Sequence, residues 1–100
     1  MLDAGYAPLL DKWLNNTPTD ERASTVEKVL VQYFGPECVR KTGGSHQFRI
    51  KHPGLAGLPG FDMAGRLSIP VKDGRRVKGY YLKRIAQAIR YLQQTADEED

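Results

Sequence analysis

The spacing of the apolar residues changes along the chain, and it constrains the fold more than any other feature. Large apolar residues recur every three or four positions over residues 6–14, 23–34 and 82–92, which is the period of one helical face. Over residues 47–51 they alternate with polar residues, as in a strand with one buried face. A chain of 100 residues with this pattern predicts one α+β domain with a single modest core.

Two helices are predicted before the first strand. The first lies within residues 1–18, ends near Asn15 and Pro18, and is expected to dock on the rest of the domain or on a partner. The second covers residues 20–34, with Thr19 or Asp20 as its N-cap, and it stops at a Gly-Pro pair.

The middle of the chain predicts strands. Residues 37–41 and 47–51 flank a Thr-Gly-Gly-Ser turn and form a β-hairpin. A glycine-rich connection, residues 52–65, is expected to pack down partly through its apolar residues, which are Leu55, Leu58, Phe61 and Met63. Residues 67–71 form a third strand, which by the presence of Pro70 either lies at a sheet edge or ends there, and residues 75–77 allow a short fourth.

The predicted fold is a three-stranded antiparallel sheet with helices on one face, plus an extra N-terminal helix. Residues 1–18 form a helical extension, 19–94 the domain, with its last helix at 79–94, and 95–100 a disordered acidic tail. Without the leading helix, the order α-β-β-β-α is that of a double-stranded-RNA-binding domain.

Charge is distributed unevenly. Residues 1–37 carry a net charge of −3 and residues 91–100 carry −4, whereas residues 38–90 hold twelve Lys or Arg and two acidic residues, a net of +10. A basic block of this density favours a polyanionic partner, above all nucleic acid. The alternative is a basic face that is merely solvated.

Several function classes are disfavoured by composition. The single cysteine, Cys38, excludes an internal disulfide and a cysteine-rich zinc site. No apolar run is long enough for a transmembrane helix, and the first ten residues do not resemble a signal peptide, so a cytoplasmic protein is expected. The sparse acids and two histidines of the basic block predict neither a metal site nor a cofactor.

His46 is the candidate catalytic residue. It follows Gly43, Gly44 and Ser45, a turn whose backbone can approach a phosphate closely. A histidine can transfer protons near neutral pH, and RNA carries its own nucleophile in the 2′-hydroxyl. In a regular strand His46 shares a face with the core residues Phe48 and Ile50, so it must reach RNA from beyond the core edge or through a bulge. The alternative is a histidine that makes ordinary hydrogen bonds at a hairpin end.

Basic residues around this turn and around the start of the last helix are candidate phosphate contacts. The predicted RNA-binding set comprises Gly43, Gly44, Ser45, Arg49, Lys51, Lys78, Lys83 and Arg84. Cations near a helix N-terminus are unfavourable for the helix itself, which favours a functional role for the last three. Arg75 and Arg76 serve either phosphate binding or solubility. His52 is predicted to be structural, and one of Tyr80 and Tyr81 is expected in the core.

Two motifs resemble those of HicA-type toxins. The stretch 42–48, Thr-Gly-Gly-Ser-His-Gln-Phe, followed by His52-Pro53, is similar to the family's GSH…F…HP segment. Residues 67–71 and 77–85 are similar to its ending, in the expected order. The resemblance covers roughly residues 22–92, but the stretch from His46 to Pro53 and the glycine-rich connection are longer than the family pattern.

The resemblance implies a double-stranded-RNA-binding-like fold, metal-independent mRNA cleavage, and a HicB-type antitoxin partner that masks the active site. The family's catalytic histidine corresponds to His46, and its glycine turn to Gly43 and Gly44. Two other readings remain open: a non-catalytic RNA-binding module, and a protein whose basic face binds an acidic protein.

Overall fold

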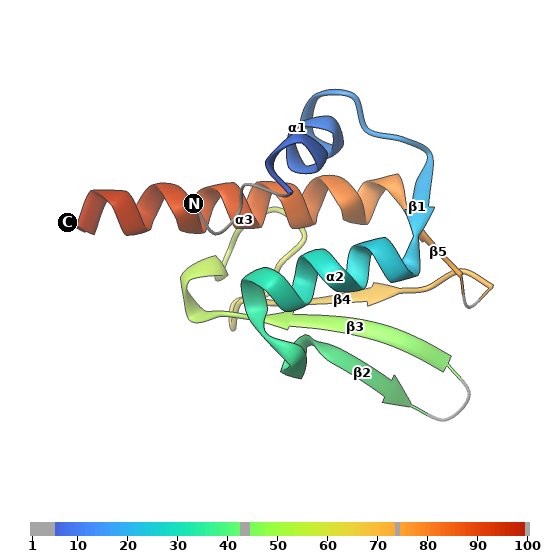
Figure 1. Cartoon of the computed structure of the whole chain (residues 1–100). Helices are drawn as coiled ribbons and strands as arrows, with labels where there is room; N and C mark the ends of the chain where they lie inside the picture. Colours follow the sequence, from blue (N-terminus) through green and yellow to red (C-terminus); the bar gives the residue numbers. More distant parts are fainter. Residues whose placement is uncertain (1–5, 43–44, 74, 100) are drawn as a thin grey trace.

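Two helices cover one face of a three-stranded sheet, and a third helix packs against the longer of them (Figure 1). The structure, a computed structural model, describes residues 6–42, 45–73 and 75–99, with side chains for all of these except 38–42, 45–47 and 96–99. The elements are α1 (Ala7–Asn15), β1 (Asp20–Arg22), α2 (Ala23–Phe34), η1 (Pro36–Cys38), β2 (Val39–Thr42), β3 (Ser45–Lys51), η2 (Pro53–Leu55), β4 (Arg66–Pro70), β5 (Arg76–Lys78) and α3 (Gly79–Glu99), where η marks a 3-10 helix. The coarse prediction of an α+β domain is confirmed.

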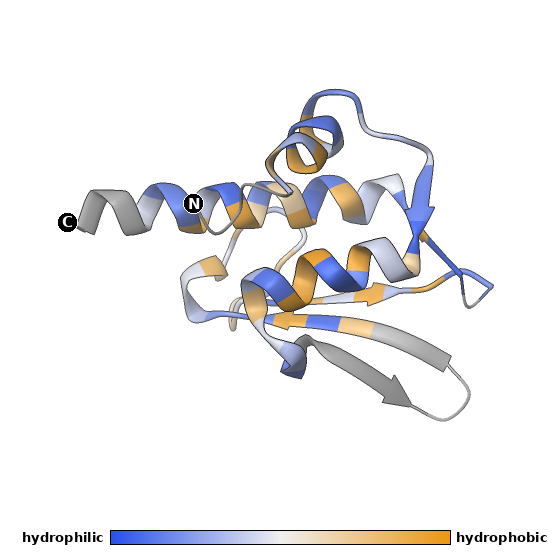
Figure 2. Ribbon diagram, in the orientation of Figure 1, coloured by the Kyte–Doolittle hydropathy of each residue, from blue (hydrophilic) through white to orange (hydrophobic). Residues whose placement is uncertain are grey.

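The larger sheet is antiparallel, with β3 between β2 and β4. Hydrophobic and hydrophilic residues alternate along residues 48–51 of β3 and along β4 (Figure 2). The buried positions of one strand face those of the other: Phe48 pairs with Ile69, and Ile50 pairs with Leu67. The predicted hairpin and the edge position of the strand that contains Pro70 are therefore confirmed.

The helices supply the other half of the core. Val26, Val29 and Leu30 on α2 are fully buried, as are Leu82 and Ile85 on α3. Burial of each such side chain contributes about 2 kcal/mol. The helical periodicity of the sequence thus identified the buried faces of both helices.

α1 docks on the domain through its apolar face. Leu10 and Trp13 are fully buried, and the helix contacts α3. At the rim of this contact, Arg90 forms a 3.0 Å ion pair with Asp11. An exposed pair of this kind contributes at most about 1 kcal/mol, so burial dominates the docking.

The start of the second helix was predicted wrongly. Asp20, Glu21 and Arg22 form β1, which pairs with β5 in a separate two-stranded sheet, and α2 begins at Ala23. The backbone of residues 20–22 is held by strand pairing with residues 76–78 and so cannot make helical hydrogen bonds. The short fourth strand exists, but it pairs with β1 rather than with the larger sheet.

Two further expectations are corrected. Residues 95–99, expected in a disordered tail, continue α3 through Glu99, because no Gly or Pro interrupts the helix after Gly79 and Ala and Glu favour helix. Met63 is 85% exposed rather than packed. Hydrogen bonds from Ala64 and Arg66 to the Asp62 side chain close a turn that carries Met63 on its outer side. Leu55 and Phe61 do pack into the core.

Candidate functional site

The hairpin of β2 and β3 carries the candidate catalytic residue. Thr42 pairs with Ser45 and Lys41 pairs with His46, so His46 lies in the second pair from the turn. The register is regular from Val39 to Thr42, and these pairs include no bulge. Gly43 and Gly44, and the side chains of Ser45 and His46, lie outside the described residues, so their roles stay predictions.

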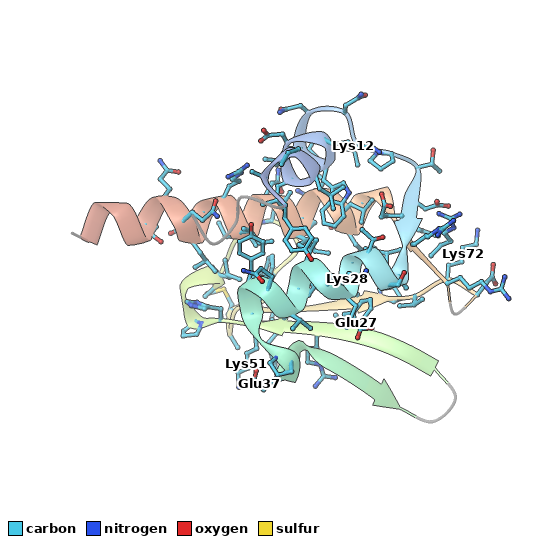
Figure 3. All side chains as sticks on the ribbon, viewed as in Figure 1. Lys12, Glu27, Lys28, Glu37, Lys51 and Lys72 are labelled. Atoms are coloured by element: carbon cyan, nitrogen blue, oxygen red, sulfur yellow. The ribbon has the colours of Figure 1, made fainter. Side chains whose placement is uncertain are left out.

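Arg49 and Lys51 lie on the face of the sheet that the helices leave open. Both are exposed and alternate with the buried Phe48 and Ile50. Lys51 stands at the end of β3 remote from the turn (Figure 3). Five residues of strand, about 17 Å of backbone, separate Lys51 from His46, so we expect the two residues to contact different phosphates.

The cations around the start of α3 form a second group. Lys78 ends β5 and Lys83 lies one turn into α3, and both are exposed. Arg84 differs from these two lysines, because its side chain contacts neighbouring residues. Its guanidinium lies 4.8 Å from the Tyr80 ring centroid and donates a 2.9 Å hydrogen bond to Gln87. A Cβ built on Gly60 would lie only 3.2 Å from the Cδ atom of Arg84, so the two residues pack closely.

The sequence-predicted cations therefore do not form one surface. Arg49 and Lys51 project from the open face of the sheet, whereas Lys78, Lys83 and Arg84 surround the start of α3, which lies on the covered face (Figure 1). Tyr80 is 54% exposed, and Tyr81 packs edge-on against it while contacting the core.

A cleft that the sequence did not predict lies between β1, β5 and the start of α2. Its volume is about 430 Å³, and it is lined by Arg22, Ala23, Ser24, Arg75 and Arg76. Strand pairing places Arg22 opposite Arg76, and the backbone N–H of Ala23 donates a 2.7 Å hydrogen bond to the Arg75 carbonyl. Arg22 was overlooked because it belongs to an acidic segment, and three charged residues give no strand signal.

The register relates this cleft to the hairpin. Pro70, the last residue of β4, pairs with Gln47, so the chain leaves the sheet beside His46. Residues 72 and 76 then form an isolated antiparallel bridge, which turns the chain back into β5. Lys72 lies at this end of the molecule (Figure 3). The cleft and His46 thus share one end of the sheet.

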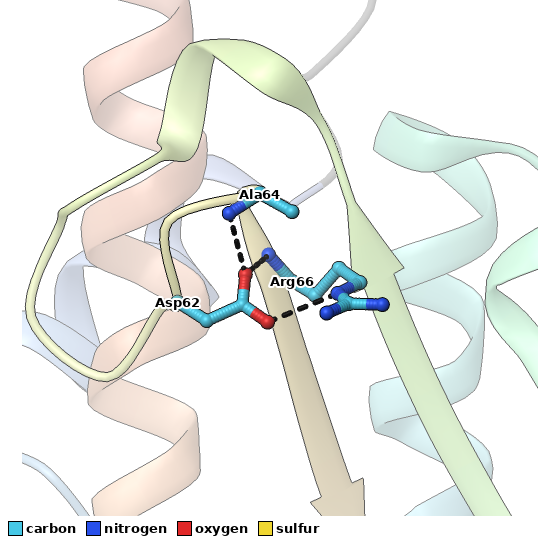
Figure 4. Close-up of polar contacts among 3 residues, drawn as sticks. All are labelled: Asp62, Ala64 and Arg66. Carbon is cyan, nitrogen blue, oxygen red and sulfur yellow. Dashed lines mark hydrogen bonds and ion pairs between the residues drawn. The ribbon is translucent and has the colours of Figure 1, made fainter.

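The long connection between β3 and β4 is held by its own polar groups. Asp62 accepts hydrogen bonds from the backbone of Ala64 at 2.8 Å and of Arg66 at 3.0 Å, and its other oxygen pairs with the Arg66 Nε at 2.9 Å (Figure 4). The hydrogen bond from the Arg66 backbone, with lesser contributions from Ala64 and the Arg66 side chain, holds the pKa of Asp62 below its ordinary value of 3.8. Asp62 therefore has a structural role here.

His52 also serves this connection. Its Nδ1 accepts a 3.0 Å hydrogen bond from the backbone N–H of Gly54 and so caps η2. The prediction that His52 is structural agrees with this role as the cap of a 3-10 helix.

In the part of the chain that the structure describes, no helix has the length and apolar character to cross a bilayer, and no three His, Cys, Asp or Glu residues form a group that could hold a metal ion. Comparisons with protein-family models, with curated proteins and with solved structures find no match to this chain.

Proposed function

We propose that this protein is a metal-independent endoribonuclease that cleaves mRNA with His46 as its catalytic residue, and that it acts as the toxin of a toxin–antitoxin pair. The observation that carries the proposal is the position of His46. It is the second residue of β3, one pair from a Gly-Gly turn, at the end of the sheet where the chain enters its basic 72–78 segment. The HicA-like motifs supply the family context.

The order of elements is consistent with a double-stranded-RNA-binding-like fold, which is part of this proposal. α2 is followed by the antiparallel strands β2, β3 and β4 and then by α3, with both helices on one face of the sheet. α1 and the pairing of β1 with β5 are additions to that arrangement. They lie on the side of the sheet that the helices cover (Figure 1).

The proposed chemistry uses the RNA as its own nucleophile. The imidazole of His46 removes the proton of a 2′-hydroxyl, and that oxygen attacks the adjacent phosphorus. The bond from phosphorus to the 5′ oxygen breaks, the departing oxygen takes up a proton from water, and the protonated His46 releases its proton to the solvent. The products are a 2′,3′-cyclic phosphate and a 5′-hydroxyl. Nearby cations stabilise the charge that develops on the phosphate oxygens.

The predicted RNA contacts divide between two places. The backbone of Gly43, Gly44 and Ser45 would hold the scissile phosphate beside His46. Lys78 and Lys83 would contact phosphates on the α3 side, where Tyr80 offers an exposed ring. Arg49, Lys51 and the tethered Arg84 are the weaker members of the set, because the first two face away from the helices and the third is held by Tyr80 and Gln87.

The proposal includes a location and a partner. A toxin of this kind acts in the cytoplasm and is restrained by a HicB-type antitoxin. The partner is expected to be encoded by a small reading frame beside this gene. Coexpression of that protein should relieve the growth arrest that the toxin causes.

The test compares the two histidines of the chain. Purified wild type, His46→Ala and His52→Asn are incubated with RNA in the presence of a chelator, and cleavage products are analysed for cyclic phosphate ends. We expect wild type and His52→Asn to cleave, and His46→Ala to be slower by about 10²–10⁴-fold. His52→Asn is the matched control because asparagine keeps an acceptor for Gly54.

Three results would contradict the proposal. Equal cleavage by His46→Ala and wild type would show that the catalytic residue is not His46. RNA binding without cleavage by the wild type would identify a non-catalytic RNA-binding module. Absence of salt-dependent RNA binding would favour a protein that uses its basic face for an acidic protein partner.

A further inference from the structure

We propose that the cleft between β1, β5 and the start of α2 binds backbone phosphates of single-stranded RNA through Arg22, Arg75 and Arg76. This inference rests on the proposed function, because it extends the RNA-binding surface of the same endoribonuclease. It gives the bound strand a contact beyond the scissile phosphate. It also makes β1, which lies outside the stretch of α2 to α3, part of the substrate-binding surface.

The lining of the cleft is cationic. Three arginines contribute to it, together with Ala23 and the hydroxyl-bearing Ser24, and no acidic residue is among the described residues that line it. Like charges gathered in one cleft repel each other, and a bound anion relieves that repulsion. The planar guanidinium presents donors in a fork that matches two oxygens of one phosphate.

The guanidinium groups in the cleft are available for a ligand. Among the described residues, the side chains of Arg22 and Arg75 have no hydrogen-bond or ion-pair partner. Arg76 lies 3.4 Å from Asp20 in an ion pair whose members are about half exposed. Such a pair is weak and can exchange for a phosphate.

Three other arginines have protein partners, whereas Arg49 is exposed and, among the described residues, has none. Arg66 pairs with Asp62, Arg90 with Asp11, and Arg84 with Tyr80 and Gln87. The contrast separates arginines that stabilise the fold from arginines that the fold presents unpaired. Arg22 and Arg75 can bind a phosphate without breaking an existing contact, whereas Arg76 exchanges its weak ion pair with Asp20.

The cleft is placed to receive a strand that leaves His46. The chain departs from β4 beside His46 and reaches the cleft within residues 71–76. The start of β3 and the end of β4 lie at the same end of the molecule as β5 (Figure 1). A single strand with its scissile phosphate at the hairpin can therefore place a neighbouring phosphate in the cleft.

The test measures RNA binding without cleavage. A short fluorescein-labelled oligonucleotide with 2′-O-methyl groups lacks the nucleophile, and its affinity is measured by fluorescence anisotropy over a range of salt concentrations. The double variant Arg22→Gln/Arg75→Gln is compared with Lys12→Gln/Lys28→Gln, which removes two positive charges from exposed residues that do not line the cleft.

We expect the cleft variant to bind more weakly and to show a shallower dependence of log K on log salt. The loss in slope is about 1.4, since each phosphate contact of a single strand contributes about 0.7. The control variant should keep a slope within about 0.3 of the wild type. Both variants replace exposed side chains, and unfolding curves of both should match that of the wild type.

The outcomes separate this inference from the proposed function. Unchanged affinity and slope in the cleft variant, with wild-type RNA binding intact, would overturn the role of the cleft and leave His46 untouched. Equal losses in the cleft and control variants would show that net charge alone matters, and would also overturn it. Absence of RNA binding by the wild type would overturn the proposed function together with this inference.

Discussion

β3 has a connection at each end, and both connections combine a histidine with glycines. At one end the hairpin turn runs Gly43-Gly44-Ser45-His46, and at the other the long connection begins His52-Pro53-Gly54. The residue types are similar, but the lengths differ. Two residues separate Thr42 from Ser45 in the hairpin, whereas fourteen separate Lys51 from Arg66.

The long connection uses its polar groups to hold itself. His52 accepts a hydrogen bond from Gly54, Asp62 binds the backbone of Ala64 and Arg66, and Leu55 is fully buried. We predict that a two-residue turn, with far fewer backbone groups, holds His46 less firmly. His52 shows that a histidine beside glycines is not in itself a sign of catalysis.

Among the substitutions that test this comparison, Gly65→Ala is expected to lower the free energy of unfolding most. Gly65 has a φ of +78°, and a Cβ built there would lie 2.0 Å from the carbonyl oxygen of His52. Because that atom belongs to the backbone, the connection must shift as a whole. We expect a loss of about 3 kcal/mol or more in the free energy of unfolding, measured by urea denaturation.

Gly57→Ala is the control for this prediction. Gly57 also has a positive φ, +82°, but a Cβ there meets nothing within 4 Å. Only the backbone strain remains, which costs about 1 kcal/mol. If the two variants lost equal stability, the close approach of Gly65 to His52 would not be what fixes the long connection.

A smaller effect is expected from His52→Ala. The change removes the acceptor of the 3.0 Å hydrogen bond from Gly54 and leaves the η2 cap unmade. Because the site is exposed, the loss in unfolding free energy should be about 1 kcal/mol or less. His52→Asn should recover most of this stability. If His52→Ala also abolished RNA cleavage, the assignment of a structural role to His52 and a catalytic role to His46 would be wrong.

The regular parts of this fold were predictable from the sequence. Apolar periodicity identified α1, α2 and α3 with their buried faces, and alternation at Phe48 and Ile50 identified the central strand. Pro70 correctly indicated an edge strand. These signals are local, because each depends on residues within one element.

The features that the sequence did not predict depend on contacts between residues that are distant in the chain. β1 consists of three charged residues and becomes a strand only because β5 pairs with it, and that pairing brings Arg22 to Arg76. The restraint of Arg84 depends in the same way on Gly60, which approaches it from the long connection. Cations are visible in a sequence, but whether they are free or already paired is decided by tertiary contacts.

The smallest predicted effect concerns the pH dependence contributed by Asp62. Its pKa in the folded protein lies below 3.8, because the Arg66 backbone and then the other donors bind the carboxylate. A lowered folded pKa means that the carboxylate adds stability above the unfolded value, and that this contribution is lost as the pH falls through the folded pKa. The change is therefore confined to pH values below about 4.

Asp62→Asn isolates this contribution, because asparagine keeps one acceptor oxygen but cannot ionise or pair with the Arg66 guanidinium. Unfolding free energies of the variant and the wild type are compared by urea denaturation at about pH 6 and at about pH 3. The wild type should be the more stable at the higher pH, and the difference should shrink at the lower one. A difference that stayed constant would mean that the ionised carboxylate does not hold the long connection, and the contrast with the hairpin would then depend on Gly65 and His52 alone.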